Sequence, residues 1–185
     1  LKMTLDKKKE ITIFQNQVSA EDEKNNRLLT EYAEYDKNLL LFKSIGDTTV
    51  ITSGGYTVEG IDITFDNKKK IIKSNNPALI QDLEKNKIYL DNFEYSTIDG
   101  LFQSIGNIKV LDTKDNKYNF SQIYIDEKTK EIVGTDAKTF LNEESFKIDK
   151  ANKPRVFSNT VNITSQGTKF TKSIFTLCNY RKNDK

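Results

Sequence analysis

Apolar and polar side chains alternate along most of this chain, and clusters of Asp, Asn, Gly and Lys interrupt the alternation at short intervals. Alternation with a period of two is typical of strands that bury one face, and such clusters are typical of turns. No stretch between residues 28 and 175 has the period of a helix. The pattern predicts an all-β protein, with strands at 10–14, 49–52, 56–58, 61–65, 71–72, 78–80, 88–90, 93–95, 108–110, 118–125 and 157–163.

The same pattern repeats along the chain. A shift of sixty positions places Glu94-Tyr95 on Glu34-Tyr35 and Ser104-Ile105-Gly106 on Ser44-Ile45-Gly46. A shift of thirty positions keeps a weaker match in four columns. The columns are Tyr35, Phe65, Tyr95 and Ile125; Phe42, Ile72, Phe102 and Ile132; Ser44, Ser74, Ser104 and Gly134; and Val50, Ile80, Val110 and Phe140. Self-similarity of this kind indicates stacked units, because one unit cannot bury its apolar face alone.

Two architectures fit a unit of this length. A parallel β-helix usually has shorter rungs, whereas a hairpin unit with turns that begin at Asp favours antiparallel pairing. Two strands of up to eight residues, each roughly 25 Å long, fill such a unit. We therefore expect an elongated antiparallel β-jellyroll built from tandem hairpin repeats of about thirty residues, which spans residues 11–175 and follows a lead-in at residues 1–10.

The composition suits a thin core with a large surface. Hydrophobic residues make up 36% of the chain and charged residues 30%, while 11 Phe and 8 Tyr at regular spacing argue against disorder. The net charge is only +2, and both KKK runs stand beside turn residues, so we expect solvated turns and no nucleic-acid partner. No run of eighteen apolar residues is present, which predicts that no helix spans a membrane.

Enzymatic chemistry is not expected. The chain has no histidine, so the usual general base and the usual zinc ligand are missing. Its acidic residues stand mostly at turns, which leaves carboxylate-only glycan cleavage as the one enzymatic alternative. The segments around Gly46 and Gly106 lack the spacing of a phosphate loop and suit bends with positive φ. We expect no catalytic residues, no metal site and no cofactor.

The apolar columns admit two interpretations. Their side chains either fill a closed core or line a groove between two splayed sheets that accepts an apolar ligand. The candidate lining residues are Phe42, Val50, Ile72, Ile80, Phe102, Val110, Ile132 and Phe140. The single cysteine, Cys178, is either a free thiol or half of a bridge to a partner outside this chain.

Tyr35-Asp36 with Phe42 and Gly46 through Val50, and Tyr95 with Phe102 and Gly106 through Val110, resemble the OstA-type repeat of the lipopolysaccharide transport proteins. This resemblance implies that acyl chains of lipopolysaccharide lie between the sheets of a periplasmic jellyroll. It also implies that an edge strand with Ile11, Ile13 and Val18 pairs with an LptA-like bridge protein by strand addition.

Within that superfamily, the tail Phe175-Thr176-Leu177-Cys178 is similar to the end of the N-terminal periplasmic domain of the LptD family. This similarity implies a disulfide from Cys178 to a C-terminal β-barrel, a linker at residues 176–185, an LptE-like plug lipoprotein as partner, and a place at the periplasmic face of the outer membrane of a Gram-negative bacterium. The alternatives are an LptA-like periplasmic bridge component and a closed β-solenoid module for adhesion or scaffolding.

Overall fold

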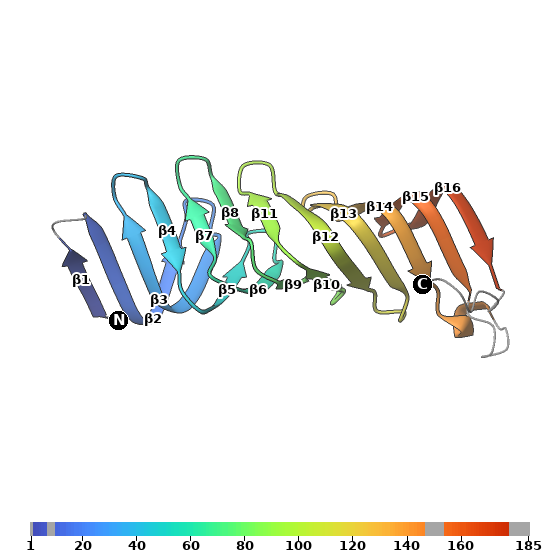
Figure 1. The fold of residues 1–185 in the computed structure, drawn as a ribbon, viewed down its shortest axis with the longest axis horizontal. Helices are drawn as coiled ribbons and strands as arrows, with labels where there is room; N and C mark the ends of the chain where they lie inside the picture. Colours follow the sequence, from blue (N-terminus) through green and yellow to red (C-terminus); the bar gives the residue numbers. More distant parts are fainter. Residues whose placement is uncertain (1, 7–9, 147–153, 178–185) are drawn as a thin grey trace.

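The computed structural model describes residues 2–6, 10–146 and 154–177. These residues form an elongated antiparallel β-jellyroll, which confirms the predicted fold class (Figure 1). The strands are β1 (Lys2–Asp6), β2 (Ile11–Glu21), β3 (Arg27–Asp36), β4 (Leu41–Ser44), β5 (Asp47–Ile51), β6 (Thr57–Ile61), β7 (Thr64–Asp66), β8 (Ile71–Ser74), β9 (Ala78–Gln81), β10 (Lys87–Leu90), β11 (Phe93–Ser96), β12 (Leu101–Leu111), β13 (Lys117–Asp126), β14 (Glu131–Phe140), β15 (Arg155–Thr164) and β16 (Gly167–Thr176). A short 3-10 helix, η1 (Glu143–Phe146), precedes β15.

The chain runs up and down, and each traverse bends or breaks near its middle. The halves of each traverse pair into two facing sheets, which we call the upper and lower sheets after Figure 1. The upper sheet contains β1, β4, β7, β8 and β11, and the lower sheet contains β5, β6, β9 and β10. The long strands β2, β3 and β12 to β16 contribute one half to each sheet. One up-and-down cycle takes about thirty residues, which is the period found in the sequence.

Two ladders of side chains face each other across the interior. In the upper sheet, Phe42 pairs with Tyr35 and Phe65, and the ladder continues through Ile72, Tyr95, Phe102, Ile125, Ile132 and Ile163. In the lower sheet, the ladder runs through Ala20, Leu28, Val50, Val58, Ile80, Ile88, Val110, Tyr118, Thr139 and Val156. Three of the four sequence columns are therefore successive positions of these two ladders, with Phe140 as the one exception among their members.

The bends use residues that tolerate left-handed backbone. Gly46 and Gly106, which match across the sixty-residue repeat, have φ angles of +85° and +129°. Both glycines interrupt a descending traverse. This confirms the bends with positive φ that the sequence predicted at these positions. In β12 the bend takes one extra residue, seen as a register shift between Ile105 and Ile108. Gly134 replaces the serine of its column because a Cβ at this position would lie 2.3 Å from the ring of Phe120.

The turns of the lower sheet are tied by a repeated side-chain pattern. The Asn116 amide donates to Asp112 Oδ2 at 2.7 Å, and the Asn116 backbone amide donates to Asp112 Oδ1 at 2.9 Å. Asp22 with Asn26, and Asp82 with Asn86, make the same pair of bonds. Each asparagine also accepts a backbone amide from the next lower turn. The asparagines therefore join successive rungs and satisfy polar groups at the sheet margin.

The outward position of Phe140 differs from the prediction. Its ring lies 5.8 Å from Lys138 Nζ on the outer face, and its neighbour Thr139 is buried instead. Phe140 does not follow the inward pattern of its column because the bend in β14, at Asp136 with φ +52°, lacks the extra residue present in β12. The inward positions therefore move by one residue, as they must when one residue is lost from a period-two pattern.

The predicted edge also differs at the N-terminal end. The lead-in contains β1, which pairs with residues 11–15, so Ile11 and Ile13 lie in an inner strand of the upper sheet. Val18 is buried, although residues 18–21 have β3 as their only neighbour among the described strands. β1 therefore forms the described N-terminal edge of the upper sheet.

We predict that Asn116→Ala lowers the free energy of unfolding by about 1–3 kcal/mol, because it leaves the Asn142 amide and Asp112 without their partner at a nearly buried site. Urea denaturation measures the change. The matched control is Asn119→Ala on the outer face of β13, the strand that follows Asn116. For this variant we expect a change within about 0.5 kcal/mol. Equal losses in the two variants would contradict a structural role for the asparagine ladder.

Candidate functional site

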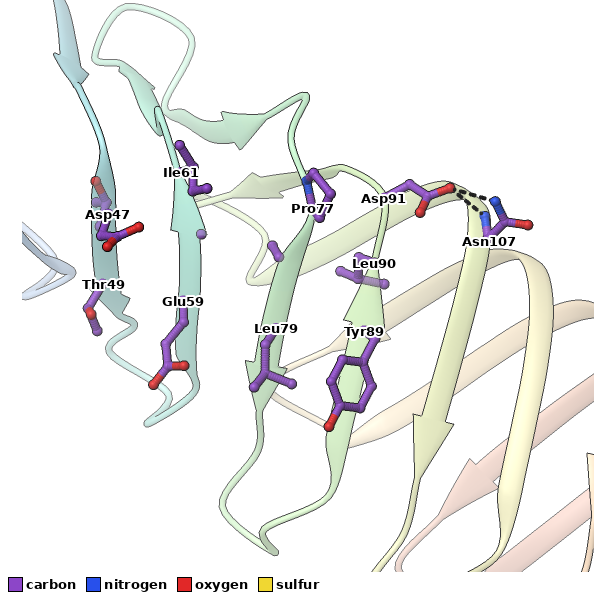
Figure 2. A pocket seen from close by; sticks show the side chains of 13 residues that line it. Asp47, Thr49, Glu59, Ile61, Pro77, Leu79, Tyr89, Leu90, Asp91 and Asn107 are labelled. Carbon is purple, nitrogen blue, oxygen red and sulfur yellow. Dashed lines mark hydrogen bonds between the residues drawn. The ribbon is translucent and has the colours of Figure 1, made fainter.

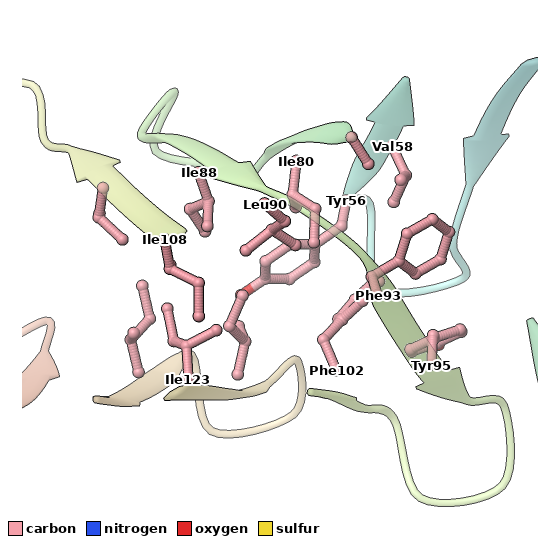
Figure 3. Packing of buried hydrophobic residues seen from close by; sticks show 14 of the residues in the cluster. Tyr56, Val58, Ile80, Ile88, Leu90, Phe93, Tyr95, Phe102, Ile108 and Ile123 are labelled. Carbon is pink, nitrogen blue, oxygen red and sulfur yellow. The ribbon is translucent and has the colours of Figure 1, made fainter. Parts of the chain in front are cut away.

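The interior between the sheets is filled over its central and C-terminal parts. Figure 3 shows Tyr56, Ile80, Ile88 and Leu90 meeting Phe102, Ile108 and Ile123, and all of them are buried. The ring of Tyr56 lies 5.8 Å from that of Phe102, and Phe102 stacks on Tyr95 at 4.2 Å. Side chains from the two sheets therefore occupy this part of the interior completely enough to form one core.

A cavity of about 210 Å³ remains between the sheets near the N-terminal end. Ala20 and Leu28 line it from the lower sheet, and Tyr35, Phe42, Phe65 and Ile72 line it from the upper sheet. The turns differ beside the cavity and beside the core. In the thirty-residue register Asn26, which lines the cavity, takes the position of Tyr56, whose ring lies 5.8 Å from that of Phe102 in the filled part.

Polar residues surround the opening of this cavity. Glu21 ends β2, Arg27 begins β3, and Asp22 and Asn26 lie in the turn between them. Asn67 lies in the turn between β7 and β8. Arg27 Nε lies 3.4 Å from Glu21 Oε2, so the opening carries both charges. An apolar interior with a polar rim is typical of a site for the hydrocarbon part of an amphiphile.

Two sets of contacts join the lower turns to the upper turns. Near the cavity, Lys70 Nζ lies 2.8 Å from Glu23 Oε1, and Lys24 Nζ donates to the carbonyl of Thr97 at 2.9 Å. Further along, Lys130 Nζ in the turn between β13 and β14 donates to the Gly54 carbonyl in a lower turn at 3.2 Å. Glu127 of the same upper turn packs against Gly54, and the Tyr95 hydroxyl of β11 donates to Glu127 Oε1 at 2.9 Å within the upper sheet. Strand continuity joins the sheets on the bend side, and these side chains join them on the turn side.

We call this row of contacts between lower and upper turns the seam. Glu127 is its most enclosed carboxylate, with 6% of its surface exposed. A Cβ on Gly54 would lie 2.6 Å from Glu127 Cδ, so only glycine allows the lower turn to approach this closely. Glu127 Oε2 has no hydrogen-bond partner among the described residues. Lys130 Nζ lies 5.0 Å from the centre of the Tyr56 ring and completes a compact clasp.

A second hollow, of about 690 Å³, lies on the outer face of the lower sheet. Figure 2 shows Thr49, Glu59, Leu79 and Tyr89 on successive strands along it, with Asp91 hydrogen-bonded to Asn107 at the bend. Asp47, Glu59 and Asp91 place three carboxylates in its lining, which has no cationic side chain. This polar outer surface suits hydrocarbon much less well than the inner cavity.

The two ends of the jellyroll differ from its middle. Met3 and Leu5 of β1 pair with Phe14 and Thr12 and are 67% and 55% exposed. At the other end, Ile174 and Phe175 of β16 are 70% and 52% exposed. Apolar side chains therefore reach solvent at both terminal strands, where no further described strand covers them.

The structure brings together only some of the residues predicted to line a groove. Phe42 and Ile72 line the cavity, whereas Val50, Ile80, Phe102, Val110 and Ile132 are buried away from it, and Phe140 faces outward. Sequence reasoning missed Ala20, Leu28, Tyr35 and Phe65 as lining residues. Tyr35 and Phe65 stand in a recognised column, so the signal was present, but their convergence with Ala20 and Leu28 depends on how the two sheets face each other.

Other kinds of site are not supported by the described residues. They contain no group of three or more His, Cys, Asp or Glu that could hold a metal ion. None of their helices is long and apolar enough to cross a membrane. Cys178 and its predicted disulfide lie outside the described residues.

Comparison with known proteins supports the jellyroll class. No protein-family model and no curated protein matches the chain. Among solved structures, it is similar to LptH of Pseudomonas aeruginosa, described as the LptA homologous periplasmic component of the conserved lipopolysaccharide transport device. The TM-score is 0.51 at 20% sequence identity, and the match covers 60% of this chain and 81% of LptH. A likeness at this identity shows that the two proteins share a fold.

Three core tyrosines predict that the protein loses stability in alkali. Burial raises the pKa of Tyr56 and of Tyr95, with a further rise for Tyr95 from its bond to Glu127, and burial raises the pKa of Tyr118 to about 12. Their stabilising effect is complete below the unfolded pKa of about 10 and is lost as pH rises above it, because the unfolded chain then releases protons that the folded protein retains.

We therefore expect the free energy of unfolding, measured by urea denaturation, to fall steeply from pH 10 to pH 11.5. The fall is up to about 1.4 kcal/mol per pH unit for each such tyrosine. The slope of this fall should be smaller in Tyr118→Phe, which removes one of the three groups. Replacing the exposed Tyr89 by Phe is the control and should leave the slope unchanged. A flat stability profile over this range would contradict the expectation.

Proposed function

We propose that this protein is a periplasmic carrier of lipopolysaccharide that holds an acyl chain between its two sheets. The observation that supports this function best is the apolar cavity lined by Ala20, Leu28, Tyr35, Phe42, Phe65 and Ile72, with its polar rim. The shared fold with LptH, a component of a lipopolysaccharide transport device, supports the same class of ligand. We favour an LptA-like bridge component over an LptD-type assembly domain, because LptH, which shares the fold, is described as the LptA homologous periplasmic component of such a device.

The size of the cavity limits what it holds in this conformation. An engineered protein cavity of about 150 Å³ binds one benzene molecule, so about 210 Å³ accepts a segment of one acyl chain. Each methylene removed from water contributes about 0.8 kcal/mol. A lipid with several chains therefore needs the sheets to separate further, and the apolar ladders that extend from the cavity provide the surface for it.

The exposed terminal strands support the bridging part of this function. Among the described strands, β1 pairs with β2 alone and has exposed Met3 and Leu5, and β16 pairs with β15 alone and has exposed Ile174. We propose that neighbouring transport proteins extend the upper sheet at these strands, with main-chain hydrogen bonds continuing the ladder. In this proposal the partner contacts β1, and not Ile11, Ile13 and Val18 as the sequence suggested, because β1 already pairs with residues 11–15.

We predict that a light-activated crosslinking residue at Leu28 captures lipopolysaccharide, because Leu28 faces the cavity. The matched control is its neighbour Leu29, which points to the outer face and is 37% exposed. A second pair, Val110 inside and Lys109 outside, reports how far the ligand path extends beyond the cavity. Capture is measured as a mass shift on a denaturing gel that reacts with an antibody to lipopolysaccharide.

The four positions separate the possible functions. Capture at Leu28 and Val110 but not at their neighbours supports a path along the whole interior, and capture at Leu28 alone supports a site limited to the cavity. Equal capture at Leu28 and Leu29 would show unspecific contact and contradict the proposal. Capture at neither, in protein with a normal β-sheet spectrum, would favour the closed β-solenoid scaffold.

A further inference from the structure

The hairpin that covers the cavity is the least supported part of the lower sheet. Residues 18–21 pair with residues 27–30, and only the latter have another neighbour, β5. β1 covers the upper half of β2 and leaves the lower half unpaired on its other side, within the described residues. Ala20 and Leu28 of this hairpin are the two side chains that close the cavity from below. Movement of residues 18–30 would therefore expose the cavity, and on the lower side it would break the pairing of residues 27–30 with β5 and the Asn26–Ser53 bond.

The hairpin has a stiff tip and a pliable base. At the tip, Asp22 accepts the backbone amide and the side-chain amide of Asn26, both at 2.9 Å. At the base, Asn16 and Gln17 have φ angles of +67° and +53°, and the register with β3 shifts between Gln15 and Val18. A bulge of this kind interrupts the strand ladder where the chain passes from one sheet to the other. The base therefore has a flexible point in β2, whereas β3 runs through it as one continuous strand.

Weak and exposed contacts hold the hairpin against the upper sheet. The Glu23 side chain of the Glu23–Lys70 pair is 72% exposed and that of Lys70 is 30% exposed. Lys24 Nζ adds bonds to the carbonyls of Thr97 and Ile98, at 2.9 and 3.3 Å. Exposed ion pairs contribute little to stability and are screened by salt. These contacts form a weak clasp, which closes the opening but is readily broken.

The next clasp along the seam is built differently. Glu127 is almost fully buried between Gly54 and Gly100 and accepts the hydroxyl of Tyr95. This second clasp covers the filled core, where Tyr56 packs on Phe102. Opening here would expose a carboxylate and large aromatic side chains together. The seam therefore has one weak clasp, which lies over the empty space, and one strong clasp over the core.

We propose that residues 18–30 act as a strap that swings away from the upper turns to admit an acyl chain sideways into the cavity. The Glu23–Lys70 ion pair sets how often the strap opens, and the Glu127 clasp marks where the opening ends. This inference rests on the proposed lipid-carrying function, because it assigns the entry route and its control to the same cavity.

Charge reversal of the ion pair tests the strap. In Glu23→Lys or Lys70→Glu, repulsion replaces attraction, and a fatty acid whose fluorescence rises in apolar surroundings should enter about two- to fivefold faster. The exchanged double variant, Glu23→Lys with Lys70→Glu, should return to the wild-type rate. The matched control is Glu84→Lys in the turn between β9 and β10, which makes the same charge change without an ion-pair partner among the described residues and should leave the rate unchanged.

A covalent lock supplies the second measurement. In a Cys178→Ser background, Glu23→Cys with Lys70→Cys is joined by a short bismaleimide, and each single cysteine treated in the same way is the control. The joined protein should lose uptake of the fatty acid at least tenfold while its thermal unfolding temperature is maintained or raised. Amide exchange of Val18 and Leu28 should slow in the locked protein and accelerate in the single charge reversals.

The outcomes separate the strap from the function on which it rests. Equal uptake rates in all variants and in the locked protein, with binding intact, would overturn the strap and leave the lipid carrier standing. Wild-type protein that takes up neither the fatty acid nor lipopolysaccharide would overturn the proposed function and the strap with it. Accelerated uptake in the single reversals, its recovery in the exchange and its loss in the lock support the strap.

Discussion

The bend in the middle of every traverse is the constraint on which this structure depends. Because each traverse supplies one half to each sheet, backbone continuity holds the two sheets together along one side only. The opposite side ends in hairpin turns, which no main-chain ladder joins across the interior. Closure there depends on side chains from turns far apart in sequence, such as Glu23 with Lys70 and Lys130 with Gly54. The molecule is therefore fixed at its bends and adjustable at its turns.

Variation between repeats decides which part of the interior is filled. Tyr56 and Asn26 take equivalent places in two successive lower turns of the thirty-residue repeat. Tyr56 packs against Phe102 in the core, and Asn26 lines the cavity. A repeated scaffold with unequal side chains thus acquires a site at one end without a change of fold.

The position of the cavity relates stability to function. The filled part contains the buried tyrosines and the Glu127 clasp, which join the two sheets there. The cavity lies beside the end strand of the lower sheet, where a hairpin has one neighbour instead of two. Local opening is least costly where few contacts are lost, so a binding site at this end need not destabilise the whole domain.

The sequence by itself determined the all-β class, the thirty-residue rung and the bends at Gly46 and Gly106, because alternation, turn residues and glycine act over a few neighbouring positions. It did not delimit β1, β3, β4, β14 or β16. It also placed the side chains of Phe42 and Ile72 on an inner face. Only the tertiary structure decided three other features. Ala20 and Leu28 face Phe42 and Ile72 across the cavity, Phe140 points outward, and β1 covers Ile11. Each depends on how separate rungs stack or on a single residue gained or lost at a bend, and period-two patterning within one strand carries no information about either.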